Sequence, residues 1–298
     1  MSDWEFLYDM NDQGFSPEEI IDAAASGAAP WEWDHIAKEE NKAEQKDNHG
    51  RQKRIVLNKC RIIFFDLEFY VPESSRKEHG FCYNPWDKKC KFLGGSFFLA
   101  NPTRDFETTN FKIKNKIKSL WLWDYQSEKQ VLEAIYILLN DVLELVRQAH
   151  KGIMVSPILC GIGITTSDLP ILVELFKRYK ILTNSEAFAF QNKFRVVDLS
   201  QLSISTFNNG NNFLYPKTKN DILTKYINGK KFESGKVVWE LYESKDYAGI
   251  EERVLDEVMS TYKCYKLIND DLHKFKALEK AEKKRMKGTL KNEDNGIN

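Results

Sequence analysis

The stretch IIFFDLEFY, residues 62–70, decides the fold class. Most of its side chains are β-branched or aromatic, which makes it too apolar for a strand with one face in water. It therefore predicts a central strand that is buried on both faces. Asp66 and Glu68 are the two charged residues in this run. Because side chains alternate along a strand, we expect both carboxylates on the same face.

Two like charges side by side on a buried strand are costly unless a cation compensates them. Mg²⁺ and Mn²⁺ prefer oxygen ligands, so a pair of divalent ions is a natural compensation. Alternatively, the strand ends at Asp66 and Glu68 lies in solvent. Asp66 and Glu68 are therefore candidate metal ligands if further carboxylates join them.

The sequence on both sides of this stretch predicts more strands and helices. Their order is typical of an α/β domain in which a mixed sheet carries helices on its faces. The residues from 71 to 91 are charged and predict no regular element. Strand candidates lie at 95–100, 120–125, 158–164 and 194–199, and helical patterns cover 128–150, the residues that follow Asp168, and 246–287.

Two further carboxylates stand at informative positions. Asp168 follows a predicted strand and precedes a predicted helix. Such a residue usually caps the helix, but ligands also bind at the carboxyl ends of strands in α/β sheets. Asp256 lies in a late helical pattern whose apolar stripe includes Val254 and Val258. Taken alone, Asp256 is typical of a solvated helix charge.

The four carboxylates in this order resemble the DEDD superfamily of 3′–5′ exonucleases. The similarity is greatest to the predicted exonucleases that resemble the proofreading domain of family B DNA polymerases. It extends over about residues 62–268. The motifs that carry it are FDLE (65–68), GITTSDLPIL (163–172), VDL (197–199), GKVVWELY (235–242) and DEVMSTY (256–262).

This resemblance implies a ribonuclease-H-like fold and a two-metal hydrolysis of terminal phosphodiesters. Asp66, Glu68, Asp168 and Asp256 would hold two Mg²⁺ or Mn²⁺ ions. One ion would activate water, and the other would stabilise the departing 3′ oxygen. The implied partner is the 3′ end of a single-stranded nucleic acid, with DNA as the expected substrate.

The chain departs from the family pattern at three places. The third motif normally has Tyr or His four or five residues before its Asp, where this chain has Glu252 and Glu251. Glu252 lies one helical turn before Asp256, so it is a candidate to position the water; alternatively, it faces solvent. Gly163 and Ser167 replace an Asn and a Phe near the second Asp. These departures leave open a catalytically degenerate protein that binds nucleic acid or a protein partner.

Substrate-binding candidates flank the predicted metal ligands. Lys231 and Lys236 belong to a lysine-rich run, residues 217–236, that could contact backbone phosphates. Phe69 and Tyr70 follow the first two carboxylates and could stack on terminal bases. The alternative interpretations are a solvated charged face and aromatic side chains that belong to the core.

The charge of the chain is unevenly distributed. Its formal net charge is zero, yet residues 1–54 hold 13 acidic and 6 basic side chains, and the rest holds 31 acidic and 38 basic ones. We therefore expect an acidic leader and linker (1–54), an exonuclease domain (55–272) and a basic C-terminal helix and tail (273–298). Ser16 and Pro17 predict a helix start in the leader. Trp4, Trp31 and Trp33 could anchor the leader on a protein partner or on the body.

Other sequence features exclude several classes of protein. No apolar run approaches the roughly 18 residues of a membrane span. The five cysteines are scattered and predict free thiols in a reducing compartment. The first residues lack the pattern of a signal peptide, so a cytoplasmic location is expected. His79, Cys82 and Cys90 have irregular spacing and no evident fourth ligand, which does not favour a zinc site.

Overall fold

The structure is a computed structural model that describes residues 10–11, 14–26, 56–103, 116–150, 154–207, 216 and 218–294. The chain divides into two compact units, Met1–Ile55 and Val56–Asn298. In the first unit, α2 spans Pro17–Ser26. Ser16 Oγ accepts a hydrogen bond from the Glu19 amide at 3.4 Å, and the Ser16 amide donates to Glu19 Oε2 at 2.8 Å. The predicted start of this helix is therefore confirmed, while Trp4, Trp31 and Trp33 lie outside the described residues.

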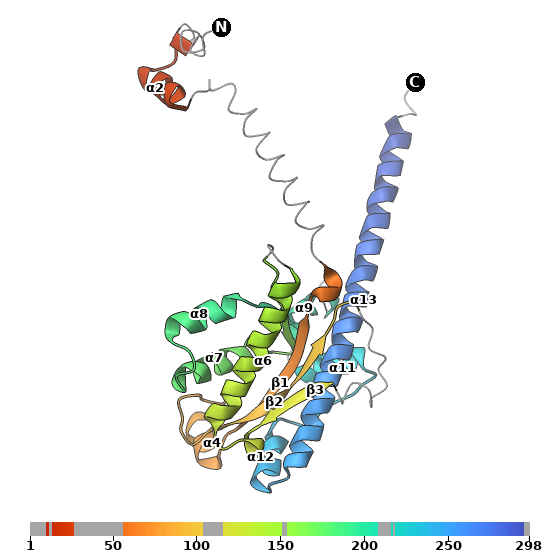
Figure 1. Ribbon diagram of the computed structural model, residues 1–298. Helices are drawn as coiled ribbons and strands as arrows, with labels where there is room; N and C mark the ends of the chain where they lie inside the picture. Colours follow the sequence, from red (N-terminus) through yellow and green to blue (C-terminus); the bar gives the residue numbers. More distant parts are fainter. Residues whose placement is uncertain are drawn as a thin grey trace. The chain divides into compact units, whose positions relative to one another are not determined.

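The second unit contains a five-stranded mixed sheet in the order β3-β2-β1-β4-β5 (Figure 1). β1 pairs antiparallel with β2 and parallel with β4, so the stretch 62–70 is the central strand, as predicted. β2 and β3 pair antiparallel, and β4 and β5 pair parallel. The strands are β1 (Ile62–Tyr70), β2 (Lys91–Ala100), β3 (Ile117–Trp121), β4 (Ile158–Gly161) and β5 (Arg195–Asp198).

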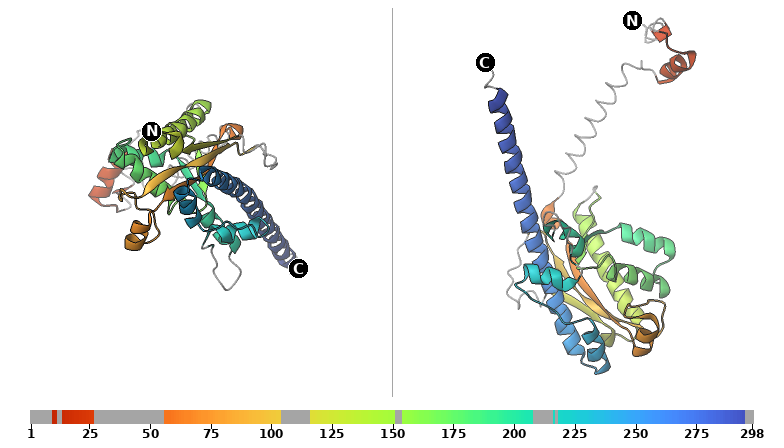
Figure 2. Two further views of the ribbon diagram at one scale, coloured as in Figure 1. Left: turned by 90° about the horizontal axis from the view of Figure 1, so that it is seen from below. Right: turned by 180° about the vertical axis from the view of Figure 1, so that it is seen from behind.

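Helices flank this sheet, which confirms the α/β class (Figures 1 and 2). The strand expected at 120–125 ends at Trp121 and continues as a 3-10 turn. Residues 71–91, expected to be irregular, include a short helix. The helices are η1 (Leu57–Lys59), α4 (Glu73–His79), η2 (Leu122–Asp124), α6 (Glu128–Ala149), α7 (Asp168–Arg178), α8 (Asn184–Asn192), α9 (Leu199–Leu202), α10 (Ile204–Phe207), α11 (Lys219–Tyr226), α12 (Lys236–Glu243) and α13 (Tyr247–Asp294).

Because side chains alternate along β1, they point into two hydrophobic cores, one on each face of the sheet. The odd-numbered side chains of the strand, Ile63, Phe65 and Leu67, pack with buried residues of α6, α7 and α8. The even-numbered Ile62 and Phe64 pack with α11, α12 and α13 on the other face. A strand covered on both faces needs apolar residues at nearly every position, which explains the composition of 62–70. Asp66 and Glu68 continue the even-numbered row, so they face the α13 side.

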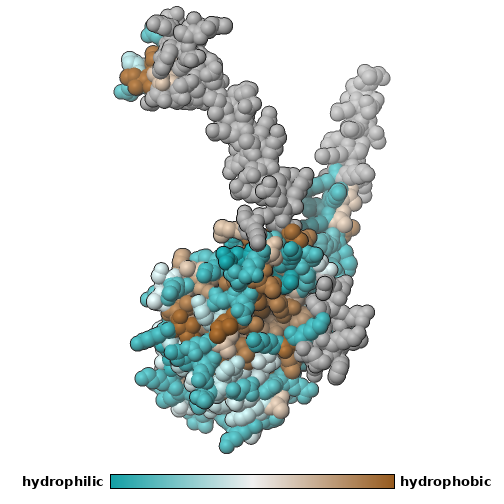
Figure 3. All heavy atoms as spheres, viewed as in Figure 1, coloured by the Kyte–Doolittle hydropathy of each residue, from teal (hydrophilic) through white to brown (hydrophobic). Residues whose placement is uncertain are grey.

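The C-terminal helix α13 is one continuous element from Tyr247 to Asp294. The boundary expected at residue 273 therefore falls inside a helix. None of the helices in the described part of the chain combines the length and apolar character needed to cross a membrane. Figure 3 shows mostly hydrophilic residues on the visible face of the body, with hydrophobic ones gathered toward its centre.

Candidate functional site

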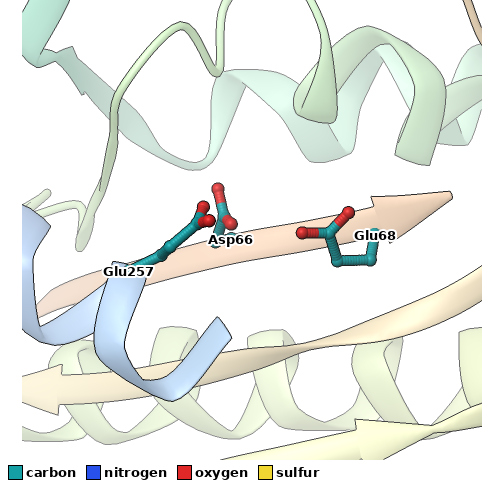
Figure 4. Close-up of side chains that lie close together, drawn as sticks. All are labelled: Asp66, Glu68 and Glu257. Carbon is teal, nitrogen blue, oxygen red and sulfur yellow. The ribbon is translucent and has the colours of Figure 1, made fainter. Parts of the chain in front are cut away.

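Three carboxylates converge near the carboxyl end of β1. Asp66 and Glu68 come from the strand, and Glu257 comes from α13. Each residue offers one oxygen atom, and these atoms lie within 4.8 Å of one another. Figure 4 shows the carboxylates of Asp66 and Glu257 close together, with Glu68 further along β1. Asp66 is only 7% exposed, so these charges share a poorly solvated environment.

A fourth carboxylate, that of Asp168, lies in the same region. Asp168 is the first residue of α7, and its Oδ1 accepts a hydrogen bond from the Leu67 amide at 3.1 Å. Leu67 stands between Asp66 and Glu68, so this bond places the Asp168 carboxyl beside the cluster. Ser167 Oγ donates to Asp168 Oδ2 at 2.5 Å. Asp168 therefore contacts the central strand instead of capping α7.

A neighbouring carboxylate, Asp198 at the end of β5, holds the loop that leads to Asp168. Its side chain accepts hydrogen bonds from the amides of Gly163 at 2.8 Å and Thr165 at 3.0 Å. It also accepts hydrogen bonds from the amide and hydroxyl of Ser200. Gly163 has a φ of 76°, which glycine adopts at little cost. Gly163 and Asp198 thus set the path of the loop.

Two cationic side chains compensate the carboxylates. The Lys219 ammonium, at the start of α11, lies 2.9 Å from Asp66 Oδ1 and also bonds Glu257 Oε2. Arg253 Nε lies 3.0 Å from the other Glu257 oxygen, one turn earlier on α13. Sequence reasoning missed Glu257 and Arg253, and it named Lys219 only as a member of the lysine-rich run, not as a partner of the carboxylates. The i,i+4 spacing of Arg253 and Glu257 is the one local signal of this network.

Burial raises the pKa of Glu68 to about 8, and the Glu257 carboxylate adds to the effect. Burial likewise raises the pKa of Asp66 well above its ordinary range, and that of Asp168 as well. For Glu257, burial acts in the same direction, but Lys219, a hydrogen bond with Asp66 and Arg253 together outweigh it, and the pKa is lowered. Desolvation alone would lower the pKa of Lys219, yet Asp66 and Glu257 raise it. The site thus holds a charged Lys219–Glu257 pair beside carboxyls that resist ionisation.

The structure does not bring Asp256 into this cluster. Its carboxylate pairs with the Lys230 ammonium at 2.5 Å, and its side chain is 43% exposed, against 3% for Glu257. Among the described residues, the cluster thus includes Glu257, the neighbour of the predicted Asp256. Glu252 is exposed on α13 and is not a member of the cluster. Glu251 accepts a hydrogen bond from the Trp123 indole at 2.7 Å.

The predicted substrate-binding residues lie at different places in the structure. Phe69 is half-buried, with its ring 4.7 Å from that of Tyr83. The Tyr70 hydroxyl donates to Glu243 Oε1 at 3.0 Å. Lys231 is exposed, and the Lys236 ammonium lies 3.7 Å from the centroid of the Phe81 ring. Lys217, the first residue of the lysine-rich run, lies outside the described residues.

A cleft of about 420 Å³ opens at the cluster. Asp66, Glu68, Asp168 and Glu257 all line it, together with Lys219. Its other lining residues include Ser167 before α7, Phe69 and residues 232–235 before α12. The cleft thus has an acidic floor that is built by three distant parts of the chain.

No protein-family model matches this chain, and no curated protein sequence matches it. The assignment of a function therefore depends on the chemistry of the site.

Proposed function

We propose that the chain is a metal-dependent 3′–5′ exonuclease with a ribonuclease-H-like fold. It would hydrolyse terminal phosphodiesters of single-stranded nucleic acid, with DNA as the first candidate. The observation that supports this proposal is the convergence of Asp66, Glu68, Asp168 and Glu257 on one cleft. The mixed sheet with a long central strand and flanking helices is compatible with such a fold.

The donor set fits a hard divalent cation. All four side chains offer carboxylate oxygens, which Mg²⁺ and Mn²⁺ prefer. Burial raises the pKa of Asp66 and Glu68, so a further positive charge beside them would be favourable. Asp66, Glu68, Asp168 and Glu257 would hold the metal, with Glu257 in place of the predicted Asp256. When bound, divalent ions supply an activated water and charge stabilisation at the phosphate.

The remaining residues of the cleft bind and position the substrate. The Leu67 amide and Ser167 hydroxyl fix the orientation of Asp168. Phe69 lines the cleft beside Glu68, so it is suited to contact a terminal base. Lys219 places an ammonium at the floor of the cleft, and this ammonium would be available to a phosphate oxygen if Asp66 held a metal instead.

The experiment is digestion of 3′-labelled and 5′-labelled single strands with Mg²⁺ or Mn²⁺. We expect stepwise loss of the 3′ label with the parent chain. The double variant D66N/E68Q, which keeps the side-chain volumes, should lose that activity. D141N, an exposed substitution on α6, serves as the matched control and should digest normally. A double variant that digests as well as the parent would show that this mechanism is wrong.

A second candidate is a nuclease-fold protein without catalysis that binds nucleic acid or a protein partner. The observation that favours it is the internal compensation of Asp66 and Glu257 by Lys219, which balances charge without a metal. Calorimetric titration with Mn²⁺ separates the two. Strand binding without turnover, together with no heat of Mn²⁺ binding, would favour this second function.

A further inference from the structure

Two stacked aromatic rings lie beside the cleft but outside it. Phe81, in the loop after α4, stacks on Trp239 of α12 with ring centroids 6.2 Å apart and an interplanar angle of 16°. Trp239 is 7% exposed, whereas Phe81 is 59% exposed. Trp239 thus supports a ring that is mostly exposed, and this ring is accessible for stacking by a planar group.

Cations accompany both rings. The Lys236 ammonium lies 3.7 Å from the Phe81 centroid, and the Arg76 guanidinium lies 4.9 Å from the Trp239 centroid. Arg76 is paired with Glu243 at 3.2 Å. Within the described part of the chain, Lys236 has no carboxylate partner. Its positive charge therefore remains available for an anion.

Backbone contacts join this aromatic pair to the cleft. The Trp239 indole donates to the Phe69 carbonyl at 2.9 Å, and Phe69 lines the cleft next to Glu68. Gly235 also lines the cleft, and Lys236 follows it directly in the chain. A ligand that extends out of the cleft past Phe69 or Gly235 would next meet the exposed Phe81 ring and the Lys236 ammonium that lies against it.

We propose that Phe81, Trp239 and Lys236 form a second binding site for single-stranded nucleic acid, next to the cleft. A base stacks on the exposed part of Phe81, Trp239 supports the ring from within, and Lys236 pairs with a neighbouring phosphate. Aromatic rings alternating with cations are how proteins bind single strands without sequence preference. The inference rests on the proposed function for the direction of the bound strand. The 3′ terminus would lie in the cleft, and nucleotides on its 5′ side would lie at this second site.

The test measures binding without turnover. Fluorescence anisotropy of a labelled oligothymidylate of about 15 nucleotides is followed in buffer with a metal chelator. F81A should weaken binding by about tenfold, as expected for the loss of one base stack. F81W should restore it. K236Q should weaken binding most at low salt and flatten its salt dependence. The control F188A removes a 71% exposed ring on α8 and should leave binding unchanged.

A second probe separates this site from the cleft. A dinucleotide that occupies only the cleft should compete equally well in the parent and in F81A. Unchanged oligothymidylate affinity in both F81A and K236Q would overturn the proposal, whatever the nuclease assay shows. If the affinity falls as expected but the parent releases no 3′ label, the binding site stands and the exonuclease function fails.

Discussion

The Lys219 ammonium lies 2.9 Å from Oδ1 of Asp66, although the two residues are 153 positions apart in the sequence. The same ammonium bonds Glu257, so it joins α11, β1 and α13 at the floor of the cleft. One cation thus serves two buried carboxylates, which would otherwise repel each other.

Removal of this cation should destabilise the chain and change its response to metal. K219M leaves Asp66 and Glu257 without their shared partner, so we expect a loss of about 3 kcal/mol in the free energy of unfolding. Mn²⁺ should then stabilise K219M more than the parent, because it replaces the missing charge. Thermal unfolding with and without Mn²⁺ measures both effects. K230M, which breaks the more exposed pair with Asp256, is the control; equal Mn²⁺ responses in all three proteins would contradict the idea.

The stability of the metal-free chain should depend on the ionisation of Glu68. Its pKa is about 8 in the folded chain, against an ordinary value of 4.5. Between these values the folded state binds more protons than the unfolded state, so this group makes stability fall as pH rises from about 4.5 to about 8. E68Q removes that contribution. Urea unfolding at pH 5 and pH 8 should therefore show a smaller loss for E68Q than for the parent, and an equal loss would contradict the prediction.

Glu257 and Asp256 should differ sharply in their importance. E257Q removes a cluster carboxylate and should lower both Mn²⁺ affinity and 3′ digestion, the latter by about 100-fold or more, since several kcal/mol of charge stabilisation are lost. D256N alters an exposed pair with Lys230 and should change either quantity less than about threefold, within the range of a surface ion pair. Calorimetry measures the Mn²⁺ affinity, and the digestion assay measures the loss of the 3′ label. The opposite ranking would favour Asp256, the residue predicted from the sequence.

Asp198 should act as a positioning residue for Asp168. D198A removes the acceptor for the Gly163 and Thr165 amides, and each unsatisfied buried donor costs about 1–3 kcal/mol. We therefore expect about 3 kcal/mol of lost stability in urea unfolding, together with weaker Mn²⁺ binding. D198N retains one acceptor oxygen and should recover part of both. If D198A binds Mn²⁺ like the parent, the loop does not need Asp198 to position Asp168.

The sequence predicted the elements whose signals are local. β1 has the predicted bounds, and α6 begins at Glu128 as predicted, after Ser127, whose side chain accepts a capping hydrogen bond from the Gln130 amide. α8 was missed because its buried side chains are few. Thr183 and Glu186, which form a capping box there, were the available signal. Local patterns thus located most of the fold.

The site was harder to predict because its contacts are tertiary. Asp66 and Glu68 followed from strand alternation, and Asp168 from its place after β4. The choice between Asp256 and Glu257 depends on the rotation of α13 about its axis, which an apolar stripe defines only coarsely. Lys219 resembled one more solvated lysine in a basic run. Nothing local shows that it reaches two carboxylates on other elements.

The alignment of the central strand determines where the carboxylates of the proposed site lie. Asp66 and Glu68 occupy the row that Ile62 and Phe64 begin, so a slip of β1 by one residue would turn both carboxylates into the α6 core. The same slip would turn Leu67 out of the α6 core toward the cleft and α13. A misaligned chain would therefore lose both the hydrophobic packing of β1 and the acidic floor of the cleft. If the cleft binds metal as proposed, stabilisation by metal would report on the alignment of this strand, and misfolded molecules would lack that response.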